Sequence, residues 1–281
     1  MSALSIAEVV KSIRDLPPLP AVVVDLMNNL NREETGARLL AEKIAQDQAL
    51  TAKTLRLANS SFYGMQRKVS TIQQAIAIAG FNNIHALVTA ASVMGRLSDA
   101  GENAFDYPAF WRHSLGTAVC ARAIARHARA NPDQAFIAGL LHDIGRLVLV
   151  SHAPSSYKQV LAYRAAEDCT IIEAEHAVLD LDHARVGKAL AEHWRFPPAI
   201  QHAIQNHHAP AGAAAGSLVA IVHIAGATAH ALDFGGEEDD LVPPISATAW
   251  DSLKLDKAFF LQMFRDAEAQ TEEAYRILMA V

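Results

Sequence analysis

The chain has 281 residues, of which 51% are hydrophobic and 19% are charged. This balance predicts a folded protein with a sizeable core and excludes a disordered chain. The 24 Lys and Arg residues are outnumbered by 30 Asp and Glu residues and form no basic cluster, which argues against a nucleic-acid-binding protein. Two cysteines without metal-ligand spacing, no signal-peptide pattern and no membrane span predict a cytoplasmic protein.

The first hundred residues carry repeated helix-start signals and no alternation of polar and apolar residues. A capping box is expected at Ser5, and the segment 16–20 (LPPLP) breaks the chain before the next helix. Ser70, with Gln73 three residues later, is expected to cap a helix that ends at Gly80. These signals predict a bundle of short helices.

The central stretch, residues 135–149, is apolar except for His142 and Asp143, so it predicts a core helix that carries two polar side chains. A buried carboxylate without a partner costs several kcal/mol, so Asp143 must be satisfied. The pair can bind one divalent ion if the helix bends there, and Gly145 is expected to permit that bend. Alternatively, the two side chains bond each other, His113 or the backbone.

Histidines occur on several apolar helix faces in the second half of the chain. In the helix that begins near Trp111, His113 shares a face with small and apolar residues, so it is either a metal ligand or a core histidine bonded to a carbonyl. Asp182 is expected to cap a helix over 183–195, in which His183 and Gly187 lie one turn apart.

Further helices are expected after this point. Thr170 begins a capping box, and a helix over 198–206 places His207 and His208 at its end. The apolar stretch 217–232 must be central, and one face carries His223, Gly226, His230 and Asp233. Residues 235–240 form an acidic loop, followed by a short helix around Trp250 and a long helix over 256–279.

Together these segments resemble an HDOD domain. The amino-terminal half of the resemblance lies in residues 16–20, in 49–64, which end in Asn59-Ser60-Ser61-Phe62-Tyr63-Gly64, and in 69–76. The second half lies in 111–114 (Trp-Arg-His-Ser), in 139–146, which contain His-Asp-Ile-Gly-Arg, and in 183–187. The resemblance covers about residues 16–232. It implies an all-α, two-lobed fold with an amino-terminal helical bundle and a second lobe similar to HD-type phosphohydrolases.

The resemblance also implies a metal site. His113, His142 and Asp143 match the first three ligands of catalytic HD domains, and His183, His207 and His208 resemble the additional histidines of HD-GYP relatives. The implied cofactor is a divalent ion of iron, manganese, nickel or zinc.

Two departures from the catalytic pattern count against turnover. Gly226 stands where the final Asp ligand is expected, and Asp233 lies two turns away, roughly 10 Å along the helix axis. His223 or His230 is a substitute ligand from an adjacent turn. No Gly-Tyr-Pro signature follows His208, so hydrolysis of cyclic dinucleotides is not supported.

These features predict three parts: an amino-terminal lobe over 1–103, an HD-like lobe over 104–234, and an acidic loop with docking helices over 235–281. The resemblance implies a bacterial regulatory module of signal transduction. We expect it to bind signalling proteins through Asn59, Phe62 and Tyr63 or to bind a ligand, without turnover. A homo-oligomer is compatible with this expectation.

Two alternatives remain open at this point. One is a metal-dependent HD-type phosphohydrolase that uses His113, His142 and Asp143, because clustered His and Asp bind ions that activate water and neutralise charge on phosphate. The other is a purely structural role for these histidines.

Overall fold

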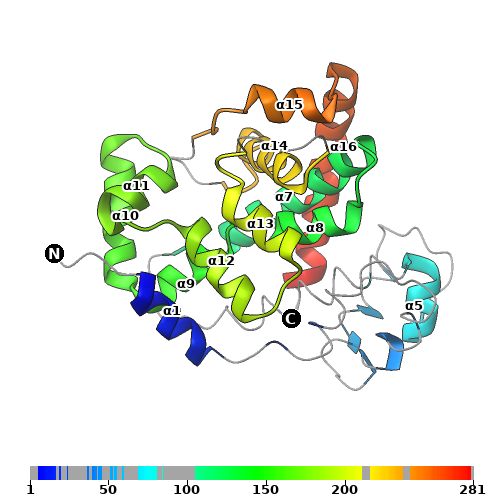
Figure 1. The fold of residues 1–281 in the computed structure, drawn as a ribbon. Helices are drawn as coiled ribbons and strands as arrows, with labels where there is room; N and C mark the ends of the chain where they lie inside the picture. Colours follow the sequence, from blue (N-terminus) through cyan, green and yellow to red (C-terminus); the bar gives the residue numbers. More distant parts are fainter. Residues whose placement is uncertain are drawn as a thin grey trace.

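The computed structural model describes residues 6–16, 69–80, 105–210, 216–236 and 241–279, and scattered positions between 19 and 59 and at 84. Every regular element in these residues is an α-helix (Figure 1), which confirms the all-α class. The helices are α1 (Ile6–Asp15), α5 (Ile72–Ala79), α7 (Tyr107–His127), α8 (Pro132–Leu141), α9 (Ile144–His152), α10 (Pro154–Glu167), α11 (Ile171–Leu179), α12 (His183–His193), α13 (Pro198–Asn206), α14 (Leu218–Ala231), α15 (Ala247–Leu253) and α16 (Lys257–Met279).

The core of the larger part is built on α7, which packs against α8, α14 and α16. Around it, α9 packs on α12, α10 on α11, and α12 on α13. Figure 1 shows α5 set apart from the other labelled helices, whereas α1 lies beside α9 and α12. The three-part division stays a prediction, and the boundary at 103 lies outside the described residues.

The local capping signals were largely sufficient to place helix starts. Thr170 forms the expected capping box, and the Asp182 carboxylate accepts a hydrogen bond from a backbone N–H in the first turn of α12. For α5 the expected cap is wrong by one residue. Thr71 accepts from the Gln74 N–H, while the Ser70 N–H donates to the Gln74 side chain. Ser70 and Thr71 both fit the sequence pattern of a cap, and the position at which the backbone becomes helical makes Thr71 the cap.

The central apolar stretch is two helices rather than one continuous helix. α8 ends at Leu141 and α9 begins at Ile144, so His142 and Asp143 form the junction. The sequence predicted that Gly145 permits the bend, and this prediction is wrong, because the junction comes before Gly145 and Gly145 lies inside α9. A Cβ there would collide with the carbonyl oxygen of His183 and lie 2.6 Å from the backbone nitrogen of Gly187. Gly145 is therefore needed for the close crossing of α9 and α12.

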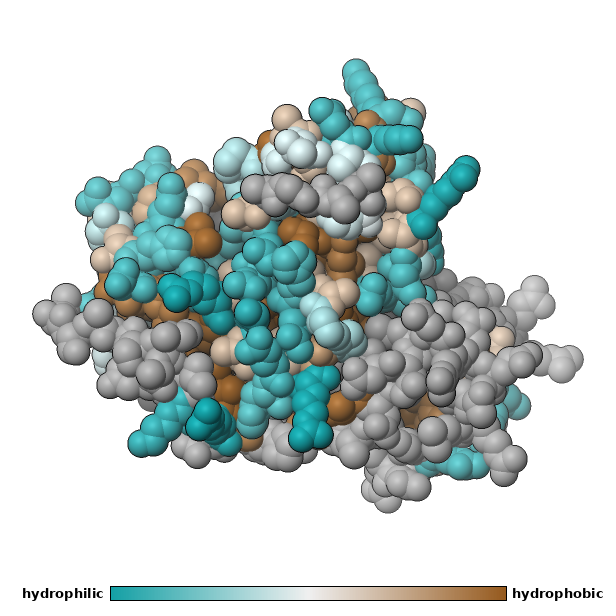
Figure 2. Space-filling view, in the orientation of Figure 1, coloured by the Kyte–Doolittle hydropathy of each residue, from teal (hydrophilic) through white to brown (hydrophobic). Residues whose placement is uncertain are grey.

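The stretch Pro132–His152 is also long and apolar enough, by length and composition, to cross a membrane, although the sequence analysis expected no span. Within the fold, 89% of its apolar window is buried against other helices. A buried core helix can be as long and as apolar as a membrane span, so length and composition alone are weak evidence for a span. On the face drawn in Figure 2, the described surface is mostly hydrophilic.

Candidate metal centre

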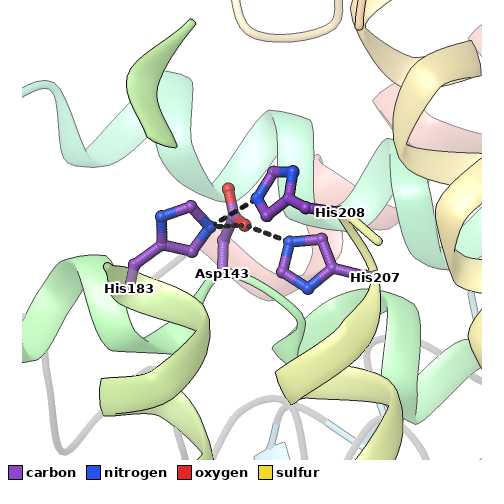
Figure 3. A group of neighbouring side chains, drawn as sticks. All are labelled: Asp143, His183, His207 and His208. Atoms are coloured by element: carbon purple, nitrogen blue, oxygen red, sulfur yellow. Dashed lines mark hydrogen bonds and ion pairs between the residues drawn. The ribbon is translucent and has the colours of Figure 1, made fainter. Parts of the chain in front are cut away.

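The cluster is assembled from four parts of the fold that are distant in sequence. His113 comes from α7, His142 and Asp143 from the α8–α9 junction, and His183 from the first residue of α12. His207 and His208 follow α13. The structure thus brings all six predicted ligands into one cluster, and Figure 3 shows Asp143 among three of the histidines.

Asp143 is the centre of this arrangement. Its Oδ1 lies 3.3 Å from the Nε2 of His142, 3.2 Å from that of His183 and 3.4 Å from that of His207. Its Oδ2 lies 3.5 Å from the Nη1 of Arg146. Three imidazoles therefore face a single carboxylate oxygen.

The remaining two histidines each lie beside one of these imidazoles. The Nε2 of His208 lies 2.9 Å from that of His183, and the Nε2 of His113 lies 3.3 Å from that of His142. Ligand atoms of Asp143, His183, His207 and His208 lie within 4.8 Å of one another, and so do those of His113, His142 and Asp143. The two groups share Asp143.

Hydrogen bonds on the outer nitrogens fix how the imidazoles point. The Nδ1 of His142 lies 2.7 Å from the Gly139 carbonyl oxygen, and the Nδ1 of His207 lies 2.8 Å from that of Ile204. A carbonyl only accepts, so each Nδ1 must carry the hydrogen. In the neutral rings the Nε2 then carries no hydrogen, and its lone pair faces Asp143.

Burial and charge set the protonation of the cluster. Burial lowers the pKa of His142 to about 3, although Asp143 opposes this shift. Burial alone would raise the pKa of the Asp143 carboxyl, but the His142 and His183 rings hold it well below its usual range. Burial alone would lower the pKa of His183, as it does for His142, but Glu175 and Asp143 raise it to about 10.

The outermost histidines are held neutral. Burial, followed by the nearby His230 and His142, lowers the pKa of His113 well below its usual value. Burial, followed by His207 and His183, does the same to the pKa of His208. Neutral imidazoles are the form that binds metals.

The donor set fits a divalent ion. Lone pairs on the Nε2 of His142 and of His207 face a carboxylate with no hydrogen between them, and the His207 Nε2 has no hydrogen-bond partner. Such an arrangement is repulsive unless a cation lies within it. Ligand atoms bound at about 2.0–2.1 Å in a tetrahedron lie roughly 3.3 Å apart, and the separations from Asp143 are 3.2–3.4 Å.

Gly226 lies at the place that the register predicted. A Cβ on it would point toward His142, whose Nε2 at 4.0 Å would be the nearest atom outside α14, so a longer side chain there would enter the cluster. Asp233 is exposed and accepts from the Gly236 N–H instead. The structure therefore offers no carboxylate from α14 (Leu218–Ala231).

The two substitutes proposed for that ligand behave differently. The Nδ1 of His223 lies 2.7 Å from the His207 carbonyl oxygen, and its Nε2 accepts from the Ser246 N–H, so both ring nitrogens are engaged. His223 therefore supports His207 from outside the cluster. The ring of His230 lies 4.3 Å from that of His113, centroid to centroid, at the edge of the cluster.

Sequence reasoning missed Glu175 and the pair Arg146 and Tyr157. Glu175 is buried on α11 and its Oε2 lies 2.6 Å from the Nδ1 of His183. A signal was present, because Glu175 shares a helix face with the apolar Leu179 four residues later.

The predicted partner-binding residues lie in the amino-terminal part. The Asn59 side chain donates to the carbonyl oxygens of Leu55 and Val69 and accepts from the Val69 N–H at 2.6 Å. Asn59 therefore ties together two segments ten residues apart. Phe62 and Tyr63 lie outside the described residues, so the partner site stays a prediction.

A cleft of about 240 Å³ opens beside the cluster. Its walls include His142, Asp143, Arg164, His208, Gly226 and Pro243. This volume is below the roughly 300–1,000 Å³ of pockets that enclose drug-sized ligands, so the cleft fits a small ligand.

Comparison with known proteins assigns the sequence to a family. The profile of the HDOD domain family matches residues 16–210. An uncharacterised protein of Treponema pallidum is 26% identical over 207 residues, which are 72% of this chain and 39% of that protein. The uncharacterised YuxH of Bacillus subtilis is 37% identical over 60 residues, which are 21% of this chain and 15% of YuxH. The chain spans well under half the length of both relatives.

Solved structures share the fold over nearly the whole chain. An HDOD domain protein of unknown function from Geobacter sulfurreducens has a TM-score of 0.83 at 24% identity, covering 99% of this chain and 100% of that one. A candidate phosphohydrolase from Shewanella amazonensis has a TM-score of 0.77 at 27% identity, covering 96% and 97%. A candidate signal transduction protein from Marinobacter aquaeolei has a TM-score of 0.79 at 23% identity, covering 98% and 62%.

Proposed function

The chain belongs to the HDOD family, and from that premise we propose that it is a regulatory module of signal transduction that holds a divalent metal ion in its HD-like lobe without turning over phosphoesters. The observation that carries this proposal is the convergence of three Nε2 atoms on the Asp143 Oδ1 at 3.2–3.4 Å. A bound ion would be a Lewis acid that attracts oxygens of an anionic ligand in the cleft.

The absence of a carboxylate from α14 supports the regulatory function. His113 and His142 contribute nitrogen ligands on that side, but Gly226 adds none. A site with fewer anionic ligands binds its ion less tightly and leaves more of the coordination sphere open to a ligand.

A second candidate is a metal-dependent phosphohydrolase. It is supported by the clustered His and Asp ligands and by the likeness to the candidate phosphohydrolase from Shewanella amazonensis. Direct assay of turnover separates the two candidates.

The proposed partners are signalling proteins. In the described part of the chain, Leu241, Val242 and Ile245 form an exposed apolar segment, with Val242 55% exposed. The segment continues from the cleft, whose lining includes Leu241. It therefore supports a contact surface next to the ligand site, in addition to the surface proposed at Asn59, Phe62 and Tyr63.

Metal analysis tests the proposal. Untagged protein purified without chelators should contain at least one equivalent of iron, manganese, nickel or zinc by elemental mass spectrometry. The Asp143→Asn variant should lose it, because Asp143 belongs to both ligand groups, whereas Asp168→Asn, at an exposed helix end, should keep it. Loaded wild-type protein should leave aryl phosphoesters intact.

Two results would contradict this function. Metal-free wild-type protein that stays empty after incubation with each ion would remove the metal centre. Hydrolysis that is present in wild type and lost in Asp143→Asn would establish the phosphohydrolase instead.

A further inference from the structure

Behind the ligands that face the cleft lies a second layer of buried polar side chains, none of which the sequence analysis assigned. We propose that Arg146, Tyr157 and Glu175 are positioning residues that close a polar ring with Asp143 and His183 and hold these two side chains as metal ligands. This inference rests on the proposed metal centre and names the residues that shape it.

The ring can be followed contact by contact from Asp143. The Asp143 Oδ2 lies 3.5 Å from the Arg146 Nη1, and the Arg146 Nε donates to the Tyr157 hydroxyl at 3.0 Å. That hydroxyl donates to the Glu175 Oε1 at 3.4 Å. The Glu175 Oε2 accepts from the Nδ1 of His183 at 2.6 Å, and the Nε2 of His183 returns to the Asp143 Oδ1 at 3.2 Å.

The donors and acceptors around this ring are consistent in direction. The Tyr157 hydroxyl accepts one hydrogen bond from Arg146 and donates its single hydrogen to Glu175. A carboxylate only accepts, so the Nδ1 of His183 must carry a hydrogen, and the Nε2 is the atom left for an ion. Each member therefore fixes the orientation of the next.

Glu175 holds His183 at two points. Its Oε2 also accepts from the backbone N–H of His183 at 2.8 Å. Because one oxygen binds both the backbone and the ring of the same residue, the imidazole cannot rotate without breaking a bond. A carboxylate behind a ligating histidine orients the ring and raises its basicity.

Arg146 acts on the other ligand. It occupies the Oδ2 of Asp143, which leaves the Oδ1 to face the three histidines. Its guanidinium also lies 5.5 Å from the ring centroid of Phe105 and 5.9 Å from that of Phe110. This apolar packing keeps the cation beside Asp143.

The ring is buried and joins four helices. Glu175 and His183 are 0% exposed, Tyr157 is 2% exposed, and Arg146 and Asp143 are each 4% exposed. Arg146, Tyr157, Glu175 and His183 come from α9, α10, α11 and α12 in turn. The ring holds the carboxylates of Asp143 and Glu175, and an ion at the Nε2 of His183 would take the place of the proton that these two carboxylates otherwise retain there.

Cobalt binding tests the proposal, with Co²⁺ as a spectroscopic stand-in for the native ion. The variants are Glu175→Gln and Tyr157→Phe. Their controls are Glu167→Gln, exposed at the end of α10, and Tyr163→Phe, which is 39% exposed on that same helix. The readouts are the visible spectrum of bound Co²⁺, its dissociation constant and the melting temperature of the metal-free protein.

The expected result is a graded loss. Glu175→Gln should weaken Co²⁺ binding by about 10-fold to 100-fold and change the visible bands, as outer partners of ligating histidines do. Tyr157→Phe keeps the carboxylate and the shape of the site, so it should weaken binding severalfold. Both controls should match wild type. If Glu175→Gln does not fold, Tyr157→Phe still decides the question.

The outcomes separate this inference from the function on which it rests. Wild-type protein that binds no Co²⁺ overturns the metal centre itself, and the ring's role with it. Wild-type binding with unchanged spectra and affinities in both ring variants overturns only the ring's role, and a lowered melting temperature alone would then assign these residues to stability.

Discussion

The two groups of ligands that share Asp143 differ in what stands behind them. On the first side, which we call the Glu175 side, His183 is fixed by a buried carboxylate through two hydrogen bonds. On the second, the Gly226 side, His142 bonds only the Gly139 carbonyl outside the cluster. On this side α14 has Gly226, which has no side chain to reach the cluster. The first side is built to hold a ligand in one position, and the second leaves space.

This difference shows that the fold accommodates a cluster to which α14 contributes no carboxylate. Gly226 lies in the interior of α14, where a small residue is compatible with the packing. Gly145 lies where backbones touch, so its replacement would separate the helices that carry Asp143 and His183. Three substitutions and one thiol modification test the contrast, beginning with the largest effect.

Gly145→Ala should be the most damaging change. Its Cβ would meet backbone atoms of His183 and Gly187, which cannot move aside as a side chain can. Overpacking typically costs about 1–3 kcal/mol and occasionally more, and contact with backbone atoms puts this variant at the upper end. We expect a lower midpoint of urea unfolding and loss of metal. Gly226→Ala is the matched control, since an alanine there has room and raises helix propensity by about 0.8–1.0 kcal/mol. Equal stability of the two variants would contradict the account of the crossing.

His223→Ala should come second. The carbonyl of His207 and the N–H of Ser246 both lose a partner. The buried carbonyl accounts for about 1–3 kcal/mol, and the half-buried Ser246 adds less. Thermal unfolding measures the loss, and metal titration should show weaker binding because His207 is less well held. His202→Ala, an exposed histidine on α13, should change neither quantity.

Gly226→Asp should strengthen the open side. A carboxylate from this position points toward the Nε2 of His142 and adds a negative ligand to the group that contains His113 and Asp143. We expect at least about tenfold tighter binding of Mn²⁺ or Zn²⁺, equivalent to about 1.4 kcal/mol, by isothermal titration calorimetry. Gly226→Asn controls for size without charge. Identical affinity in these two variants would mean that the missing carboxylate does not explain the open side.

The smallest effect concerns Cys120, two turns after His113 on α7. Burial raises the pKa of its thiol to about 12, so below that pH it stays a thiol rather than the reactive thiolate. At pH 8 a disulfide reagent should modify only the partly exposed Cys169 in native protein and both thiols after denaturation. Prompt reaction of Cys120 would show that the Gly226 side is loosely packed and not only short of a ligand.

Local features of the sequence were enough to predict much of this structure. The caps at Thr170 and Asp182 act within one turn, so their residues identify the helix starts directly. The six ligands were matched through resemblance, and the register that assigned Gly226 agrees with the direction of its missing side chain.

The features that were missed depend on contacts between distant segments. Glu175 and His183 meet only because α11 folds back beside α12, and no local pattern names that pair. A glycine can permit a bend or a close approach, and the sequence of residues around Gly145 does not distinguish these roles. His223 looked like a ligand because it faces inward, yet its neighbours occupy both ring nitrogens.

The most direct test of the metal centre is a crystal structure of protein loaded with Zn²⁺ or Mn²⁺, measured at the absorption edge of that metal. The account predicts an anomalous peak bonded to the Asp143 Oδ1 and to at least two of the Nε2 atoms of His142, His183 and His207. Loaded crystals with no peak at Asp143, or with peaks only on exposed histidines such as His202, would contradict it.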